Sequence, residues 1–304
     1  MQLIVLNYFF IALFIKNYNM KKINLLLGVL MLVLSSCSSD SGETDTPATP
    51  STVLVKKIVE LDKDGKEIST TDFVYNGNKI VSEVTAKKDF SVVGNIGFLY
   101  QYKTEYTYSG NLITSIKVKN IFGNQDKLVL KTDFLYNNSE ELISSTREQY
   151  FDTFKGILRL VYNKLDANTV SCKMYSSDSR DNIETQIWEG KFSFDTNKNL
   201  VKSESLDASF LFGSFEYDTK SNPKKDVLGL NKIMFQEIAP LYNASTLRYH
   251  LNRFNNILKS NISGSFPRYN QYTYSANGYP SEMKEFYIYN GNNIHDVTFK
   301  YFYE

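Results

Sequence analysis

The sequence predicts an all-β fold, an antiparallel meander of β-hairpins that is strongly curved or closed into a barrel. One unit recurs along the chain: an aromatic residue, a short turn rich in Asn, Gly, Asp and Ser, and then Ile, Leu or Val. Between these turns, apolar and polar side chains alternate with a period of two. Asn, Gly and Asp supply the positive φ angles that a tight reversal needs, so each unit is typical of a β-hairpin.

The chain opens with the features of an exported lipoprotein. Lys21 and Lys22 precede an apolar run over residues 23–33, and Leu34-Ser35-Ser36-Cys37 follows it. A cationic start, an apolar core and small residues before a cysteine resemble a bacterial lipoprotein signal peptide with its lipobox. We therefore expect residues 1–37 to hold the signal and Cys37 to carry the lipid that anchors the mature chain to the membrane.

Residues 1–19 fit this signal poorly. Their apolar run, from Leu3 to Ile15, is shorter than the roughly 20 residues that span a bilayer. We favour Met20 as the true start of the chain. A long signal, or a transmembrane anchor made of both apolar runs, is the alternative, although the lysines between the runs would be costly in hydrocarbon.

Residues 38–52 are rich in Ser, Thr, Asp, Glu, Gly and Pro, which predicts a flexible tether between the lipid and the folded part. Asp40, Glu43 and Asp45 lie close behind Cys37. Acidic residues at this place resemble the signal for export to the cell surface in Bacteroidetes. An ordinary solubilising linker explains them equally well.

The charge of the mature chain is close to balanced. Lys16, Lys21 and Lys22 precede Cys37, and without them the 34 basic residues fall to 31, against 33 acidic residues, for a net charge of −2. This balance lacks the basic footprint of a nucleic-acid-binding protein, and it adds nothing to membrane binding beyond the lipid anchor.

Cys172 is the only cysteine besides Cys37 in the sequence. With Cys37 acylated, Cys172 has no partner, so no disulfide is expected. The alternation around Cys172 predicts a small buried strand residue.

The folded part, residues 53–304, is expected to be a single β-meander domain. Its successive aromatic anchors are Tyr75, Tyr108, Tyr136, Tyr162, Phe194 and Tyr217, with later copies of the unit at residues 272–280 and 287–292. The intervals between the anchors, roughly 23 to 33 residues, each fit two strands and two turns. A meander of about fourteen to sixteen strands normally curls or closes.

Alternation alone does not say which face of the sheet is outside. The polar face carries many Lys and Glu, and the apolar face mixes tyrosines with Thr and Gly. A lipid anchor would also be redundant on an integral membrane barrel. We therefore expect a porin-like but soluble barrel, whose charged face contacts water.

One insertion interrupts the pattern near residues 228–260. Leu247, Leu251 and Phe254 fall at i, i+4 and i+7 there, a modest helical stripe. We expect a helix or a long loop between hairpins, which plugs or caps the sheet.

At these residues the chain resembles a known group. Phe215-Glu216-Tyr217-Asp218-Thr219-Lys220-Ser221-Asn222-Pro223 is similar to the Tyr-Asp and Asn-Pro signature of YD-repeat-like lipoproteins from Bacteroidetes, and Asn255-Asn256-Ile257 and residues 272–280 also resemble it. The resemblance covers most of residues 53–304, although several copies lack the Asp after Tyr. It implies a family of unknown function with a porin-like, curved antiparallel fold, and it transfers no catalytic residue.

The sequence offers no catalytic, cofactor or metal signature. Asp62-Lys63-Asp64-Gly65-Lys66-Glu67 superficially resembles the opening of a calcium loop, but it lacks the third oxygen ligand before the glycine and the distant Glu. Residues 63–66 fit a hairpin turn better. His250 and His295 are expected to be ordinary polar positions. Most aromatic side chains are expected in the core, with Tyr242 and Tyr279 the candidates for display at turns.

Three functions are compatible with these observations. The first is a non-enzymatic, lipid-anchored protein at the outer membrane, on its periplasmic or cell-surface face, which binds a glycan or a protein. The second is a structural subunit of an envelope complex. The third and weakest is a glycan-active hydrolase with a carboxylate pair inside the curved sheet. An exposed aromatic patch would favour the first, a large apolar face the second and two converging carboxylates the third.

Overall fold

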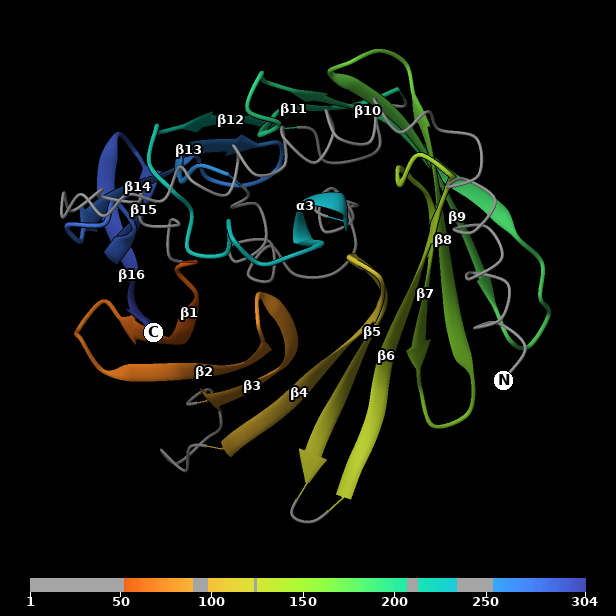
Figure 1. Ribbon diagram of the computed structural model, residues 1–304, viewed down its shortest axis with the longest axis horizontal. Coiled ribbons are helices and arrows are strands. Elements are labelled where there is room, and N and C mark those ends of the chain that lie inside the picture. Colours follow the sequence, from red (N-terminus) through yellow and green to blue (C-terminus); the bar gives the residue numbers. More distant parts are fainter. Residues whose placement is uncertain (1–51, 90–97, 123–124, 207–212, 234–253) are drawn as a thin grey trace, which may run out of the picture. The chain divides into compact units, whose positions relative to one another are not determined.

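The computed structural model describes residues 52–89, 98–122, 125–206, 213–233 and 254–304. Residues 52–304 form one compact unit. In these described ranges, sixteen antiparallel strands follow one another around a closed barrel, and β1 pairs with β16 to complete the ring (Figure 1). The predicted all-β antiparallel barrel is thereby confirmed, with the strand number at the upper end of the expected range.

The first half of the barrel consists of β1 (Val55–Asp62), β2 (Glu67–Asn76), β3 (Lys79–Asp89), β4 (Phe98–Ser109), β5 (Leu112–Phe122), β6 (Gln125–Tyr136), β7 (Leu142–Tyr150) and β8 (Lys155–Lys164). The second half consists of β9 (Thr169–Asp178), β10 (Thr185–Phe194), β11 (Leu200–Ser205), β12 (Gly213–Tyr217), the short helix α3 (Leu230–Ile233), β13 (Ile257–Ile262), β14 (Arg268–Tyr274), β15 (Pro280–Tyr289) and β16 (Asn292–Tyr303).

The period-two patterns direct the apolar side chains into the barrel. On β10, Trp188 and Phe192 are buried, whereas Glu189 and Lys191 between them lie on the outer wall. Gly190 is required between the two aromatic residues, because a Cβ there would lie 2.2 Å from the Trp188 ring and 2.4 Å from the Glu204 carbonyl oxygen. The Trp188 indole therefore packs directly against the backbone, where its Nε1 donates to Ser205 Oγ at 3.0 Å.

One end of the barrel, which we call the tyrosine rim, is where the even-numbered strands end and their aromatic anchors lie. Six of the described strand pairings at this rim shift register at the same place: the anchor pairs with a buried residue, and the next residue of the partner strand is left out of the ladder. Tyr75, for example, pairs with Ile80, and Val74 pairs with Ser82, so Val81 is bulged. Since a bulge bends its strand and increases the local twist, its repetition curves the sheet toward closure.

Four tyrosine hydroxyls at this rim each tie one hairpin together. Each donates to a carbonyl at the start of the neighbouring odd-numbered strand: Tyr75 to Val55 at 2.8 Å, and Tyr136 to Ile113, Tyr217 to Leu200 and Tyr303 to Pro280, each at 2.7 Å. Burial raises the pKa of Tyr75, Tyr136 and Tyr303, which keeps these hydroxyls protonated as donors at neutral pH.

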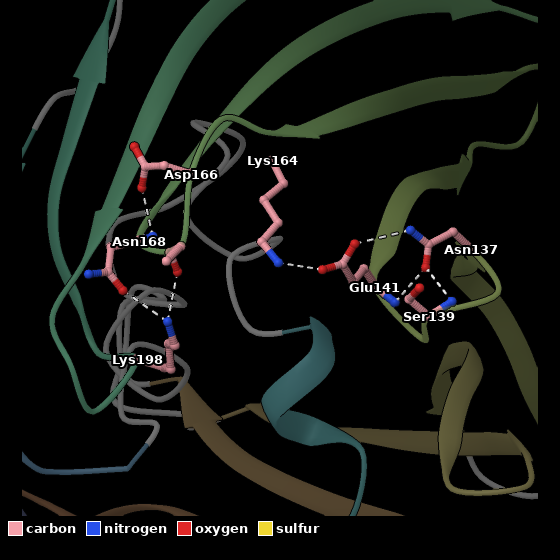
Figure 2. A network of polar contacts seen from close by, with 8 residues as sticks. Asn137, Ser139, Glu141, Lys164, Asp166, Asn168 and Lys198 are labelled. Atoms are coloured by element: carbon pink, nitrogen blue, oxygen red, sulfur yellow. Dashed lines mark hydrogen bonds and ion pairs between the residues drawn. The ribbon is translucent and has the colours of Figure 1, made fainter.

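Lysine side chains join neighbouring turns along the tyrosine rim (Figure 2). Lys164 Nζ lies 2.6 Å from Glu141, which in turn accepts a hydrogen bond from Asn137 at 3.1 Å. Lys198 Nζ donates to the Ala167 carbonyl at 2.7 Å. Because these side chains are exposed, the contacts order the turns more than they stabilise the fold.

The insertion between β12 and β13 enters the barrel at the tyrosine rim, and we call its described residues, 218–233, the plug. Its described part lies within the ring of strands (Figure 1). The Leu228 amide donates to Asn78 O at 2.9 Å, and the Tyr108 hydroxyl donates to Leu228 O at 3.1 Å. Val227 is buried in one hydrophobic cluster, Ile233 is buried in the other, and the side chain of Leu230 packs against both.

The insertion differs from the prediction at its C-terminal end. Residues 257–260 belong to β13, because Ile257 anchors a further strand opposite Tyr217. Phe254 lies in a bend and not in a helix. Leu247 and Leu251, which completed the predicted stripe, lie outside the described residues, as do Tyr242, His250 and Cys37.

The last predicted copy of the hairpin unit, residues 287–292, lies at the opposite rim. It joins β15 to β16 through a two-residue turn in which Asn290 and Gly291 both have positive φ. The pairing closest to that turn is regular, without the bulge of the tyrosine rim. The Tyr-Asn-Gly sequence thus specifies a tight turn, but it does not specify at which of the two rims of the barrel the turn lies.

We expect Tyr136→Phe to lower the free energy of unfolding by about 1 kcal/mol, because it removes the hydrogen bond to Ile113 O and leaves that carbonyl without its donor. Urea denaturation of the purified protein measures the loss. Tyr175→Phe on the outer wall is the matched control, and an equal loss in both variants would contradict the role of the rim tyrosines.

We expect Gly190→Ala to destabilise the barrel by about 1–3 kcal/mol, because the added methyl group overlaps the Trp188 ring and the Glu204 carbonyl. Gly156→Ala is the control, since its Cβ would come no closer than 3.5 Å to the Phe151 ring. Thermal unfolding of both variants tests the prediction, which fails if Gly190→Ala matches the wild type.

Candidate functional site on the outer wall

The residues that the sequence singled out have structural roles where the structure describes them. The Asp62 carboxylate accepts hydrogen bonds from the amides of Asp64 and Lys66, which makes residues 62–67 a hairpin turn. Cys172 is fully buried, and burial raises the pKa of its thiol. His295 lies on β16, 3.0 Å from the Thr298 hydroxyl.

Tyr279 is not displayed at its turn, and that expectation was wrong. Its side chain is only 7% exposed, and its hydroxyl donates to Asp226 of the plug at 2.6 Å. Asp218 of the Tyr-Asp signature is equally structural. It accepts hydrogen bonds from the Asn256 amide at 2.9 Å and from the Tyr274 hydroxyl, and so holds the two ends of the insertion together.

A pocket of 430 Å³ lies where β12, β13 and β14 meet. Most of its lining side chains lie on the outer wall. The full lining consists of Ser214, Glu216, Lys259, Ser260, Asn261, Pro267, Arg268, Tyr269, Ile288 and Asn293. Hydroxyl, amide and charged groups converge there around one aromatic ring. Few sites of this kind occur on a protein, and a concave surface with convergent polar groups is the natural place to look for ligand binding.

The pocket exists because the sheet is thinly paired at this seam. β13 and β14 pair at two described positions, Lys259 with Tyr269 and Ser260 with Arg268. Toward the tyrosine rim, side-chain hydrogen bonds join β13 to β14 in place of backbone pairing. Asn270 Nδ2 and the Tyr272 hydroxyl both donate to Ile257 O, at 2.9 and 3.1 Å.

Charge inside and around the pocket is paired. Lys259 Nζ lies 3.0 Å from Glu216, and both side chains are well exposed. The Arg268 guanidinium turns inward, where its Nη1 donates to Glu285 and, at 2.7 Å, to Asp296. These two carboxylates raise the pKa of Arg268 although burial opposes the shift, so the cation is fixed at the edge of the pocket.

A row of aromatic rings continues from the pocket across the outer wall. The Tyr269 ring stacks on Phe286 with centroids 4.8 Å apart and planes 7° apart, and Phe286 contacts the His295 ring at 5.2 Å. A second group lies at the opposite rim, where Phe266 contacts Tyr287 and Tyr289 at 5.8 and 5.3 Å. Phe266 is 53% exposed and Tyr289 49%, so this second group is displayed to solvent.

The rest of the outer wall is charged. Ion pairs lie on it within one strand, between Lys103 and Glu105 and between Lys131 and Asp133, and across two strands, between Lys119 and Glu105 and between Lys173 and Glu189. A lipid-facing wall would instead carry an apolar band with aromatic girdles. These rows of charge indicate that the outer wall contacts water. No helix among the described residues is long and apolar enough to cross a membrane.

The pocket is suited to binding. Within the described ranges, no group of three or more His, Cys, Asp or Glu side chains could hold a metal ion. Glu216 is the one carboxylate in the lining, and it is paired with Lys259. Sequence reasoning missed Tyr269 and Arg268 because they begin a strand, whereas display was expected at the turns.

No protein-family model matches the chain, and no curated protein does. Solved structures similar to it include a porin-like protein from Bacteroides uniformis ATCC 8492, with 12% identity and a TM-score of 0.37 over 82% of this chain and 98% of that chain. A porin-like protein from Bacteroides vulgatus ATCC 8482 shares 13% identity with a TM-score of 0.36, over 83% of this chain and 99% of that chain.

Proposed function

We propose that this chain is a non-catalytic, lipid-anchored envelope protein whose barrel binds a glycan at the outer-wall pocket. The observation that carries the proposal is the pocket bordered by Tyr269 and its aromatic row. The electron-rich face of an aromatic ring attracts the C–H groups on a sugar face, as it attracts the positive edge of another ring. The hydroxyl and amide groups of Ser214, Asn261 and Asn293 match sugar hydroxyls as donors and acceptors.

Hydrolysis of a glycan is supported less well. A glycosidase needs two carboxyl groups that flank the scissile bond, and one of them must act as a proton donor. Glu285 and Asp296 do converge, but Arg268 donates to both and holds them in an ion pair. A carboxylate beside a guanidinium is stabilised in its charged form, which opposes a role as a general acid.

A structural role in an envelope complex is the second candidate. Val74 and Val81 form a small apolar patch on neighbouring strands of the outer wall and are 53% and 43% exposed. Leu135, at 57% exposed, is four strands from Val74. Single exposed apolar residues are normal on a protein surface. We therefore rank this role below glycan binding.

The anchor and the location rest on the N-terminal sequence. We propose that Cys37 is lipidated, that the chain belongs with YD-repeat-like lipoproteins, and that the barrel lies at the outer membrane. The charged outer wall supports this arrangement, because a water-facing barrel needs a separate attachment to stay at the membrane.

We expect Tyr269→Ala to weaken glycan binding roughly tenfold, because the ring that stacks on the sugar is lost. Calorimetric titration of gluco-, manno- and xylo-oligosaccharides into the purified protein measures the effect. Tyr175→Ala is the matched control, since Tyr175 is an outer-wall ring on β9 that lies under the Arg159 guanidinium, five strands away from β14 around the barrel. Equal affinity in the two variants would sink the pocket as the binding site, and no binding of any sugar would favour the structural role.

We expect Cys37→Ser to abolish incorporation of radiolabelled palmitate and to release the protein from the membrane fraction, because the acylated thiol is the attachment. Cys172→Ser is the control, because that thiol is buried in the barrel. Labelling that survives in Cys37→Ser would refute the anchor. Protease treatment of intact and lysed cells then separates the cell-surface from the periplasmic location.

A further inference from the structure

Arg147 on β7 is a charged residue that the outer-wall site does not use. It pairs with Thr132 of β6 and Leu158 of β8, two buried residues, so its side chain points into the barrel. Ser145, two residues earlier on the same face, is 2% exposed, and its hydroxyl lies 3.4 Å from that of Tyr162. The guanidinium is therefore placed on an inward wall of hydroxyl-bearing and aliphatic side chains.

Among the described residues, Arg147 has no carboxylate partner of the kind that holds two other cations of the barrel. Arg268 is held by Glu285 and Asp296, and Lys224 of the plug lies 3.8 Å from Glu83. By contrast, Arg147 Nε is enclosed and has no hydrogen-bond partner within the described part of the chain, and no carboxylate described there forms an ion pair with it. Glu83 is four strands away around the ring, and Glu285 eight.

A guanidinium whose Nε is buried without a hydrogen-bond partner among the described residues is unfavourable. Burial lowers the pKa of Arg147, yet arginine remains protonated in proteins, so the charge persists. Replacing such a group by an apolar side chain of similar volume is often neutral or stabilising. A bound oxyanion would supply the missing partner, because the planar fork of N–H donors matches a carboxylate or a phosphate.

We propose that Arg147 anchors an anion-binding subsite inside the barrel, where it takes a carboxylate or phosphate group of a ligand with the Ser145 and Tyr162 hydroxyls beside it. The subsite lies on β7 and β8 and is separate from the pocket on β12, β13 and β14. It therefore stands or falls independently of glycan binding at Tyr269.

The first test measures stability without a ligand. The full mature chain in detergent is compared with Arg147→Met and with the matched control Arg159→Met, in which an outer-wall arginine loses its ion pair to Glu184. Because the buried Nε has no hydrogen-bond partner among the described residues, Arg147→Met is expected to unfold at the same temperature as the wild type or a higher one. A lower unfolding temperature in Arg147→Met, with Arg159→Met unchanged, would show a structural partner for Arg147 and overturn the proposal.

The second test measures binding of glucuronate, of inorganic phosphate and of glucose as the neutral control, by calorimetry at constant ionic strength. At least one of the two anions is expected to bind the wild type, with affinity roughly tenfold or more weaker in Arg147→Met and unchanged in Arg159→Met. The preferred anion identifies the ligand group as a carboxylate or a phosphate. Equal anion affinity in the two variants, or no anion binding to the wild type, would overturn the proposal.

Discussion

The barrel depends on one repeated constraint, the register shift beside each aromatic anchor of the tyrosine rim. The bulge bends the strand, and the anchor then reaches inward to a buried residue of its partner. At four places a tyrosine hydroxyl closes the arrangement with a bond to the neighbouring strand. The plug depends on this curvature, because Leu230 can contact both hydrophobic clusters only where the strands surround it.

The same geometry explains how charge is distributed. Alternation sends every second side chain outward, and the outward set pairs Lys with Glu or Asp, both along one strand and across neighbouring strands. Inside, polar groups are enclosed and their pairing becomes energetically important. The thin β13–β14 seam differs from the rest of the barrel on both faces. There, Arg268 forms an ion pair on the inner face, and the adjacent residue, Tyr269, places an aromatic ring on the outer face.

Much of the fold could be predicted because hairpins are local. Turn residues, period-two alternation and anchor spacing all act within a few tens of residues, and they gave the strand order, the inward face and the plug. The bulges could not be predicted, since the sequence does not mark Val81 or its equivalents as left out of the ladder. The pocket was also missed, because it arises from a short pairing between two strands. The turn at Asn290 shows the limit of local patterns, because they do not determine at which rim of the barrel a turn lies.

The position of the tyrosine-to-carbonyl bonds bears on how such a barrel can evolve. Each bond lies within one hairpin, from the end of its second strand to the start of its first, and the bond from Tyr75 to Val55 in the first hairpin matches the bond from Tyr303 to Pro280 in the last. Four hairpins thus carry their own fastening, whereas the bulges lie in the pairings between one hairpin and the next. Duplication or loss of one hairpin changes the circumference by two strands and leaves every remaining fastening intact. A barrel built this way can be resized in even steps, and the pairings that must be remade are those between the changed hairpin and its two neighbours in the ring.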